Sequence, residues 1–330
     1  MVIFMLPHMP WDLKPIPIPK ALLLKLIELL KEKIQMGILE PLMGPYSNQW
    51  FTMTKKSRAL KFIQDMQPTN KVTIRNMGSE PMVNKFAEAF ARRAIYSMGD
   101  LYSSYDQFQL AIERKDITTI RTPLGLLKMC TLPQGATNLV AHMQNTMNKV
   151  LRDFIPKKTM PFLDDIPIKG CAVEEKDESL DDQGCRRFVA NHIQDVEQIL
   201  SRLEDMGLTL SRTKSIFGFS KVIVVGHLYG TFGRKPSLIK VDVIQHIQDC
   251  TSFIEVRRFL GANVFYYIWI PHYAYITEPA FELLRKGKKF KMGHTSRRSY
   301  GSVETSISVI SYLEKNRLSM WKTYDCDGKH

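Results

Sequence analysis

The most informative stretch of this chain is Met160-Pro161-Phe162-Leu163-Asp164-Asp165-Ile166-Pro167-Ile168, where two adjacent carboxylates stand between apolar residues. Aspartate is unfavourable in a strand-like run, and a buried carboxylate needs a metal, a partner or a proton. Two short extended segments that meet at the Asp-Asp turn would hold both acids at the tip of a hairpin. The pattern alone leaves two interpretations open, a metal site and a hairpin stabilised by salt bridges.

A second pair of aspartates serves as an internal comparison. Asp181-Asp182 lies in the acidic, polar run 174–182, without apolar flanks. Such a charge run is typical of a solvated loop. The flanks of Asp164-Asp165, in contrast, predict burial, and a buried carboxylate needs a metal, a partner or a proton.

The composition indicates a globular protein with an anionic partner. Of 330 residues, 44% are hydrophobic and 24% charged, which is ordinary for a chain with a sizeable core and more than one lobe. The 46 Lys and Arg against 33 Asp and Glu give a net charge of +13. This balance favours nucleic acid as the partner, and an anionic membrane second.

Cysteine usage and the N-terminal residues predict the compartment. The five cysteines are odd in number and contain no CxxC pair, so neither a disulfide framework nor a zinc site is indicated. The apolar opening ends at Pro7 and lacks the basic start and length of a signal peptide. The apolar runs are too short to span a membrane. We expect an intracellular protein that is neither secreted nor membrane-bound.

Periodicity predicts the order of elements along the chain. Prolines make residues 1–19 an extended arm, and an apolar stripe predicts a helix from 20 to 36. Strands at 50–54 and 60–65 flank the basic run 55–58, which is either a solvated hairpin tip or a phosphate-binding finger. Helices are predicted at 80–93, 136–154, 186–206, 242–247 and 255–265, and a strand at 221–226.

One further strand carries an acid at its end. The run Ile95-Tyr96-Ser97-Met98-Gly99-Asp100-Leu101 reads as a short apolar strand, and Asp100 follows its apolar part. The end of a strand in an open sheet is a common place for a catalytic acid. Leu132-Pro133-Gln134-Gly135 then opens the helix that precedes the Asp-Asp stretch.

In this order, the elements resemble the reverse transcriptases of gypsy-class LTR retrotransposon polyproteins, of fungal type, over residues 20–293. The family's strand ends in Asp and Leu before a Ser-Gly-Tyr-His-Gln-like run; here it is Asp100-Leu101-Tyr102-Ser103-Ser104-Tyr105-Asp106-Gln107. The Tyr-or-Phe, X, Asp, Asp signature matches Phe162 to Asp165, and the following motif's lysine matches Lys214.

The C-terminal part carries further similarity to the same family. The primer-grip element, Leu-Gly-His in the family, is similar to Val225-Gly226-His227. The thumb's Leu-Gly, Tyr-Tyr and Pro pattern is similar to Leu260-Gly261, Tyr266-Tyr267 and Ile270-Pro271-His272.

The resemblance implies an α+β fold of the right-hand polymerase type, with fingers, palm and thumb and an antiparallel palm sheet backed by helices. The implied domains are an arm at 1–19, fingers leading into the palm at 20–94, a palm at 95–230, a thumb-like part at 231–293 and a degenerate or truncated tail at 294–330. The palm would include a finger hairpin at 107–135 and an acidic loop at 171–184.

The implied activity is RNA-directed DNA polymerisation. Nucleotidyl transfer uses two hard cations about 4 Å apart, here Mg²⁺ with Mn²⁺ as a substitute, and few carboxylates suffice to hold them. Adjacent residues of an extended chain face opposite ways, so Asp164 and Asp165 are not equivalent ligands. We expect Asp100 and Asp164 to bridge both metals, with Asp165 secondary.

Other roles follow from the same resemblance. Tyr105 is expected as the steric gate under the incoming sugar, or as an ordinary half-buried core tyrosine. The implied substrate-binding residues are Leu101, the turn residues Gln134 and Gly135, the fingers residue Asp65, and Lys61 with Lys55 or Lys56 on the triphosphate. Lys61 stands in place of a family arginine. Lys214 is either a proton donor to pyrophosphate or a solvated lysine. The implied partners are a primed RNA or DNA template and deoxynucleoside triphosphates; the oligomeric state is left open.

Departures from the family pattern support a second hypothesis. Ser104 replaces a glycine, Met66-Gln67 replaces an aromatic-Arg pair, and no ribonuclease H, protease or integrase motif is found. The chain is therefore expected to be truncated before ribonuclease H. It is either a polymerase, in a cytoplasmic retroelement particle or the nucleus, or an inactive remnant or domesticated nucleic-acid-binding protein. A P-loop phosphotransferase is disfavoured, since no Gly-rich loop ending in Gly-Lys-Ser/Thr is present.

Overall fold

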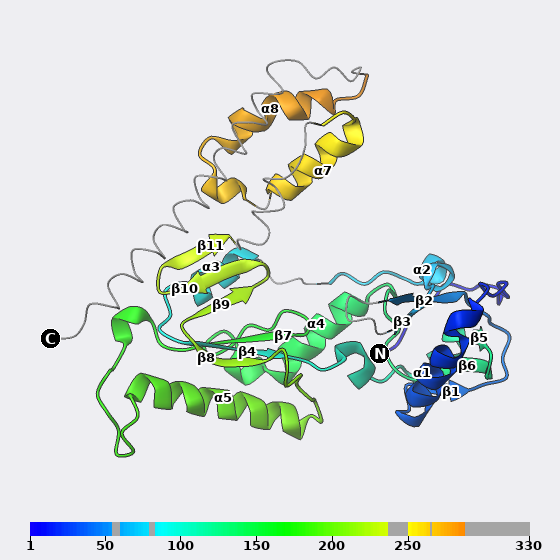
Figure 1. Ribbon diagram of the computed structural model, residues 1–330, viewed down its shortest axis with the longest axis horizontal. Helices are drawn as coiled ribbons and strands as arrows, with labels where there is room; N and C mark the ends of the chain where they lie inside the picture. Colours follow the sequence, from blue (N-terminus) through cyan, green and yellow to red (C-terminus); the bar gives the residue numbers. More distant parts are fainter. Residues whose placement is uncertain (55–59, 79–82, 237–249, 265, 288–330) are drawn as a thin grey trace. The chain divides into compact units, whose positions relative to one another are not determined.

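The computed structural model describes residues 1–54, 60–78, 83–236, 250–264 and 266–287 (Figure 1). Contacts group the chain into two units, which are described separately. The first comprises Met1–Val222 with Gly230–Gly233, and the second comprises Ile223–Tyr229 with the residues from Arg234 onward. The predicted domain boundaries remain predictions, but residues 223–229, expected in the palm, belong to the second unit.

The central sheet of the first unit has the strand order β7-β4-β8, with β4 (Tyr96–Asp100) between β7 (Asp165–Lys169) and β8 (Ile216–Phe219). Both pairings are antiparallel, and Asp100 lies opposite Asp165 at the end of the β4–β7 ladder. Because directly paired residues share a face, Ser97 and Gly99 lie on the same face as Ile166 and Ile168. The predicted strand through Asp100 is confirmed.

Two helices cover that face of the sheet. They are α4 (Leu139–Val150) and α5 (Arg187–Asp205), and Figure 1 shows α5 running alongside the strands. Met143, Met147, Ile199 and Leu203 form one buried cluster with the β7 isoleucines. The helix predicted from 136 begins at Leu139 because Asn138 adopts a left-handed conformation, with φ of 71°. The helix predicted at 186–206 is confirmed.

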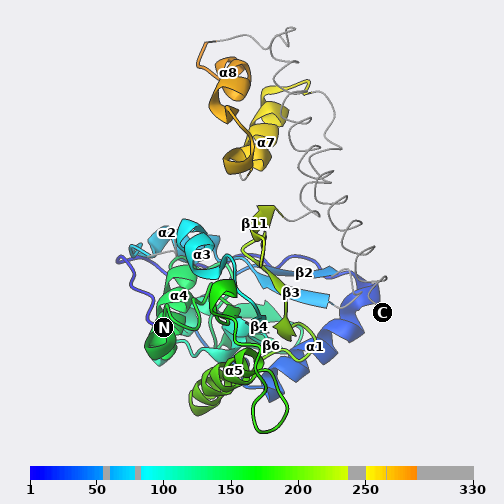
Figure 2. The same ribbon diagram turned by 90° about the vertical axis from the view of Figure 1, so that its left-hand side faces the viewer.

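Two smaller sheets lie at the other end of the first unit (Figure 1), and Figure 2 looks toward them from the left-hand side of Figure 1. One has the order β1-β6-β5, built from β1 (Leu39–Pro41), β6 (Gly125–Met129) and β5 (Ile120–Thr122). The other is the hairpin of β2 (Trp50–Thr54) and β3 (Leu60–Gln64). Helix α1 (Leu23–Gln35) contributes Leu26 and Leu30 to the core they share with Trp50. The hairpin predicted here is confirmed, while its basic tip lies outside the described residues.

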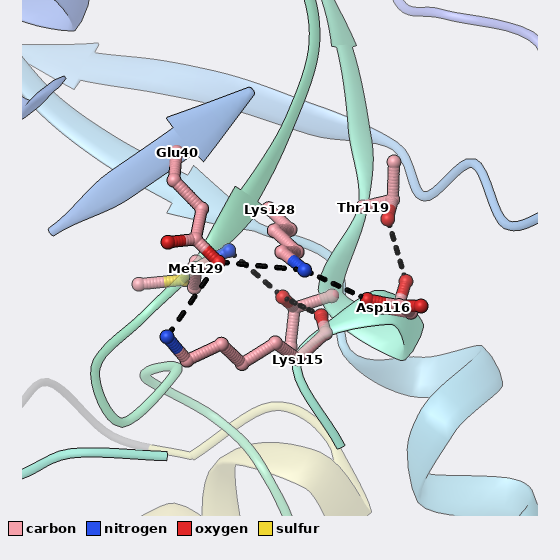
Figure 3. A network of polar contacts seen from close by, with 7 residues as sticks. Glu40, Lys115, Asp116, Thr119, Lys128 and Met129 are labelled. Carbon is pink, nitrogen blue, oxygen red and sulfur yellow. Dashed lines mark hydrogen bonds and ion pairs between the residues drawn. The ribbon is translucent and has the colours of Figure 1, made fainter. Parts of the chain in front are cut away.

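A network of charged side chains joins the first of these sheets to the segment before it (Figure 3). Lys128 Nζ lies 3.0 Å from Asp116 Oδ1 and 3.4 Å from Glu40 Oε1, and Lys115 Nζ lies 3.5 Å from the same Glu40 oxygen. The lysines are mostly buried and the acids are partly solvated. The network therefore compensates the charge of two buried ammonium groups.

The remaining elements of the first unit are short. The N-terminal arm bridges Met5 to Thr73 and Asp12 to Ser47. Helices α2 (Gln67–Val72) and α3 (Val83–Phe90) follow the β2–β3 hairpin. Short 3₁₀ segments complete it, at Lys20–Leu22, Ser104–Gln107, Ile112–Arg114, Asp116–Thr118, Arg152–Phe154 and Val173–Glu175.

The second unit is built around helices α7 (Phe253–Val264) and α8 (Tyr273–Leu283), with a 3₁₀ turn at Tyr267–Trp269 between them. Val256, Phe259, Leu260 and Ala280 belong to its buried core. A three-stranded sheet with order β11-β10-β9 is formed by β9 (Lys221–Val224), β10 (His227–Gly230) and β11 (Gly233–Pro236), of which Lys221, Val222, Gly230 and Gly233 are assigned to the first unit. The helix predicted at 242–247 and the tail lie outside the described residues. Across the described part of the chain, no helix has the length and apolarity to cross a membrane.

Candidate active site

The three predicted aspartates meet at one end of the central sheet. Asp100 ends β4 and lies opposite Asp165, the first residue of β7. Asp164 occupies the preceding turn, and its carbonyl oxygen accepts a hydrogen bond of 3.0 Å from the Leu101 N–H. All three are partly buried. Residues 64 or 65 positions apart are thus adjacent because of strand pairing.

The turn that presents Asp164 is strained and is held by a buried glutamine. Leu163 has φ of 56°, a left-handed conformation that is uncommon for a non-glycine residue. Gln144 Oε1 accepts the Leu163 N–H at 2.9 Å, and Gln144 Nε2 donates to the Pro161 carbonyl at 2.9 Å and to Asn148 Oδ1 at 3.0 Å. One amide on α4 therefore binds both sides of the turn.

Sequence reasoning missed Gln144, although a signal was present. It falls within the apolar stripe of α4, next to Met143 and one turn before Asn148, and it is 1% exposed. An amide in a buried stripe needs partners, and this points to a hydrogen-bonding role.

Gln144→Met should lower the free energy of unfolding by about 2 kcal/mol, since it leaves the Leu163 N–H and the Pro161 carbonyl without their partner. Methionine has a similar length, so the change creates little empty volume. Asn145→Ala, an exposed position on the same helix, is the control. Urea unfolding of both variants measures the difference, and equal stabilities would contradict the assigned role.

Lys214 neutralises part of the acidic cluster. Its Nζ lies 3.0 Å from Asp100 Oδ1 and 3.2 Å from Oδ2. The turn 211–215 that carries it is bonded to the backbone of Asp100 twice: Ser211 N–H donates to the Asp100 carbonyl at 2.7 Å, and Asp100 N–H donates to Ser215 Oγ at 3.1 Å. The lysine is thus held at the carboxylate by a turn wrapped around Asp100.

The electrostatics of the site show an excess of negative charge. Burial, followed by the charges of Asp164 and Asp100, raises the pKa of Asp165 to about 6, and Lys214 only partly offsets this. The hydrogen bond to Asp100 raises the pKa of Lys214. Burial and the charge of Asp164 raise the pKa of the Tyr105 phenol. Three carboxylates therefore face a single ammonium group.

This donor set fits a hard divalent cation. Among the described residues, no group of three or more His, Cys, Asp or Glu side chains is already arranged to hold a metal ion. Magnesium, however, takes few protein oxygens and completes its shell with water and substrate phosphates. Burial, and after it the charges of Asp164 and Asp100, raise the pKa of Asp165, and such a cation would neutralise these charges.

Asp165→Asn should raise the free energy of unfolding in the presence of a chelator by roughly 1–2 kcal/mol at pH 7, allowing for solvent screening. The folded-state pKa of about 6 exceeds the ordinary value of 3.8. The folded state therefore favours the protonated Asp165 carboxyl. The contribution of this group to the free energy of unfolding is fully present below pH 3.8 and is lost as the pH rises through 6. Urea unfolding at pH 7 and pH 4 checks this, because the gain should vanish at pH 4. An equal gain at both pH values would contradict it.

A cavity of about 570 Å³ lies between α1, β3 and the 3₁₀ turn after β4. Its lining includes the predicted Lys61 and Gln134, together with Tyr102 and Asp106. Lys33 Nζ, 3.5 Å from Asp106 Oδ2, also faces it. Two lysines and several amides in one hollow can receive an anionic, hydrogen-bonding ligand.

Tyr105 does not line this cavity. Its half-buried ring packs instead beside the core clusters that contain Leu101 and Leu132. The proximity that the structure does give is to Asp164, whose charge contributes to the raised pKa of Tyr105.

Other predicted substrate-binding residues occupy separate places in the first unit. Asp65 Oδ1 accepts the Gln67 N–H at 2.9 Å. Gly135 has φ of 91°, a conformation that glycine adopts without strain, and its carbonyl accepts from Asn70 Nδ2. Leu101 is buried in the core. Lys55 and Lys56 lie outside the described residues.

The predicted primer-grip residues belong to the second unit. Val225 and Gly226 form the β9–β10 turn, with φ of 49° and 75°. Two positive φ values are typical of a tight hairpin turn, although a β-branched residue is rare there. His227 is 2% exposed, and its ring centroid lies 5.4 Å from that of Trp269.

Comparison with known proteins identifies related sequences and folds. The chain is 25% identical over 264 residues to the retrovirus-related Pol polyprotein from transposon 297 of Drosophila melanogaster, covering 78% of this chain and 23% of that protein. It is 24% identical over 274 residues to the corresponding polyprotein from transposon gypsy of the same organism, and the match covers 81% of this chain and 25% of that protein. It is 21% identical over 291 residues to the Tf2-3 polyprotein of Schizosaccharomyces pombe, and the match covers 88% of this chain and 21% of that protein. The chain spans about a quarter of the length of these relatives.

Solved structures share the fold. The foamy viral protease-reverse transcriptase in complex with double-stranded DNA matches with a TM-score of 0.77 at 18% identity, over 91% of this chain and 50% of that chain. The same protein in complex with RNA/DNA hybrid matches with a TM-score of 0.72 at 18% identity, over 91% and 38%. The predicted α+β right-hand polymerase fold is confirmed. The family model described as "Reverse transcriptase (RNA-dependent DNA polymerase)" matches residues 50–249, and the chain therefore belongs to the reverse transcriptase family.

Proposed function

We propose that this chain is an RNA-directed DNA polymerase that adds deoxynucleotides to a primer 3′-hydroxyl. The observation that carries the proposal is the meeting of Asp100, Asp164 and Asp165 with Lys214 at one end of the central sheet. Family membership supplies the reaction class. The cluster supplies the hard oxygen ligands and the proton-bearing group that the reaction requires.

The residues divide into two roles. Asp100 and Asp164 would hold Mg²⁺, or Mn²⁺ in its place, with Asp165 secondary. When bound, the metal pair neutralises charge at the primer hydroxyl and the triphosphate. Lys214 is protonated at neutral pH, because the ordinary pKa of lysine is well above 7 and the hydrogen bond to Asp100 raises the pKa of Lys214 further. Its side chain is 65% exposed, and its ammonium group can donate that proton to the departing pyrophosphate.

The proposed substrates follow from the net charge of the chain and from the residues that line the cavity. A chain with a net charge of +13 favours a polyanionic duplex, so a primed RNA or DNA template is the proposed partner. The solved relatives in complex with double-stranded DNA or RNA/DNA hybrid support this choice. The cavity lined by Lys61 and Gln134 is proposed to receive the incoming deoxynucleoside triphosphate.

Extension of a DNA primer on an RNA template, with Mg²⁺ and all four deoxynucleotides, tests the proposal. The wild-type chain should extend the primer, and an Asp164→Asn chain prepared in parallel should not. Binding of the primer–template is measured separately by its salt dependence. Intact binding with no extension in either Mg²⁺ or Mn²⁺ would overturn the proposal in favour of a non-catalytic nucleic-acid-binding remnant.

A further inference from the structure

The segment 209–211 runs beside 100–102 without forming a regular strand. Tyr102 N–H donates to the Thr209 carbonyl at 2.9 Å, and Ser211 N–H donates to the Asp100 carbonyl at 2.7 Å. Leu101 and Leu210 form only an isolated bridge. Because register in such a short, irregular pairing is weakly specified by the backbone, a side chain that bonds both segments can decide it.

Gln107 is that side chain. It ends the 3₁₀ turn Ser104–Gln107, and its amide makes three hydrogen bonds. Nε2 donates to the Tyr102 carbonyl at 2.5 Å and to the Thr209 carbonyl at 3.0 Å, while Oε1 accepts the Thr209 N–H at 2.7 Å. The amide therefore binds both backbone groups of Thr209 and connects them to the residue that follows Leu101.

The bonding pattern requires a glutamine. Both amide hydrogens face carbonyl oxygens, and the amide oxygen faces an N–H, so the amide orientation is determined by its partners. A glutamate of the same length would turn a carboxylate oxygen toward two carbonyl oxygens. An asparagine is one methylene shorter and would not reach. Gln107 also lines the cavity of about 570 Å³, but its amide nitrogen and oxygen are already bonded to Tyr102 and Thr209.

The segment that Gln107 holds leads directly into the turn around Asp100. Ser211 begins that turn, Ser215 accepts the Asp100 N–H, and Lys214 between them contacts the Asp100 carboxylate. A shift of Thr209 along 100–102 would displace the whole turn. We propose that Gln107 is a positioning residue that sets the register of 209–211 on 100–102 and thereby places the Lys214 ammonium group at Asp100.

The first test requires no activity. Hydrogen exchange at the Thr209 amide and the rate of Lys214 acylation at fixed pH are compared in wild type, Gln107→Met and Gln107→Asn. Both rates should rise by about tenfold in the two variants, because the Thr209 N–H loses its acceptor and Lys214 leaves its carboxylate. Gln194→Ala, an exposed glutamine on α5, is the matched control and should change neither rate. Hydrogen exchange at the buried amides of α5 reports global unfolding. Faster exchange confined to residues 208–215 would therefore separate a positioning role of Gln107 from general destabilisation.

The second test rests on the proposed polymerase function. Gln107→Met should lower the kcat of primer extension by about tenfold and leave KM for the nucleotide within about twofold. In a Lys214→Met background, the same change should cost less than about twofold, because the group it positions is gone. A purely structural role of Gln107 predicts that Gln107→Met lowers kcat by the same factor in the wild-type and Lys214→Met backgrounds.

The two tests fail in different ways. Unchanged exchange at Thr209 and unchanged acylation of Lys214 in folded variants would overturn the positioning role, whatever the chain catalyses. Equal costs of Gln107→Met in the wild-type and Lys214→Met backgrounds would overturn it as well. Absence of polymerisation by the wild type, with the expected changes in exchange and acylation, would overturn only the proposed function.

Discussion

Replacement of Asp100 or Asp164 by asparagine should lower the rate of primer extension by at least roughly 1,000-fold, because each change removes a charged group that we propose as a metal ligand. Asparagine keeps the size of the side chain, and the Asp100 backbone retains its bonds to Ser211 and Ser215. The fold should therefore survive. The loss of one like charge also reduces the repulsion that raises the pKa of Asp165.

Single-nucleotide extension under saturating substrate measures this effect. Asp182→Asn is the matched control, since Asp182 belongs to the chain's other Asp-Asp pair and is exposed in the acidic loop. It should extend primers at the wild-type rate. Thermal unfolding in a chelator verifies that the inactive variants are folded. Near-wild-type extension by Asp100→Asn or Asp164→Asn would show that the metal-ligand assignment is wrong.

Tyr105→Ala should raise the ratio of ribonucleotide to deoxynucleotide incorporation by roughly tenfold or more, if ring contact excludes the 2′-hydroxyl. The ring is half-buried and lies near enough to Asp164 for that charge to raise its pKa. Removing it opens room next to the proposed metal ligands. The salt dependence of duplex binding should stay the same, because no phosphate contact is lost.

A conservative variant separates the ring from its hydroxyl. Tyr105→Phe keeps the ring and should leave the incorporation ratio unchanged, although it removes the phenol whose pKa is raised. The measurement is competition between ribo- and deoxynucleotides on one template. If active Tyr105→Ala kept the wild-type ratio, Tyr105 would be a core tyrosine, consistent with its packing beside the clusters that contain Leu101 and Leu132.

The local elements were predictable from the sequence because their signals are short-range. The apolar stripe of α5 repeats at the helical period, and the sequences of β2 and β3 flank a basic run, so both predictions follow from neighbouring residues. The apolar flanks of Asp164-Asp165 likewise distinguished this pair from the solvated Asp181-Asp182. The start of α4 was missed by three residues, because the left-handed Asn138 is a conformational choice that periodicity does not report.

The arrangement of the site was decided by tertiary structure. The sequence singled out Asp100, Asp164, Asp165 and Lys214, but only strand register places Asp165, rather than Asp164, opposite Asp100. Only the turn 211–215 brings Lys214 to Asp100 across 114 positions. The hydrogen-bonding roles of Gln144 and Gln107 could not be predicted from the sequence, because their partners lie 19 and 102 positions away. Periodicity records which face of an element is buried, whereas a side chain's hydrogen-bond partner depends on which distant segment packs beside it.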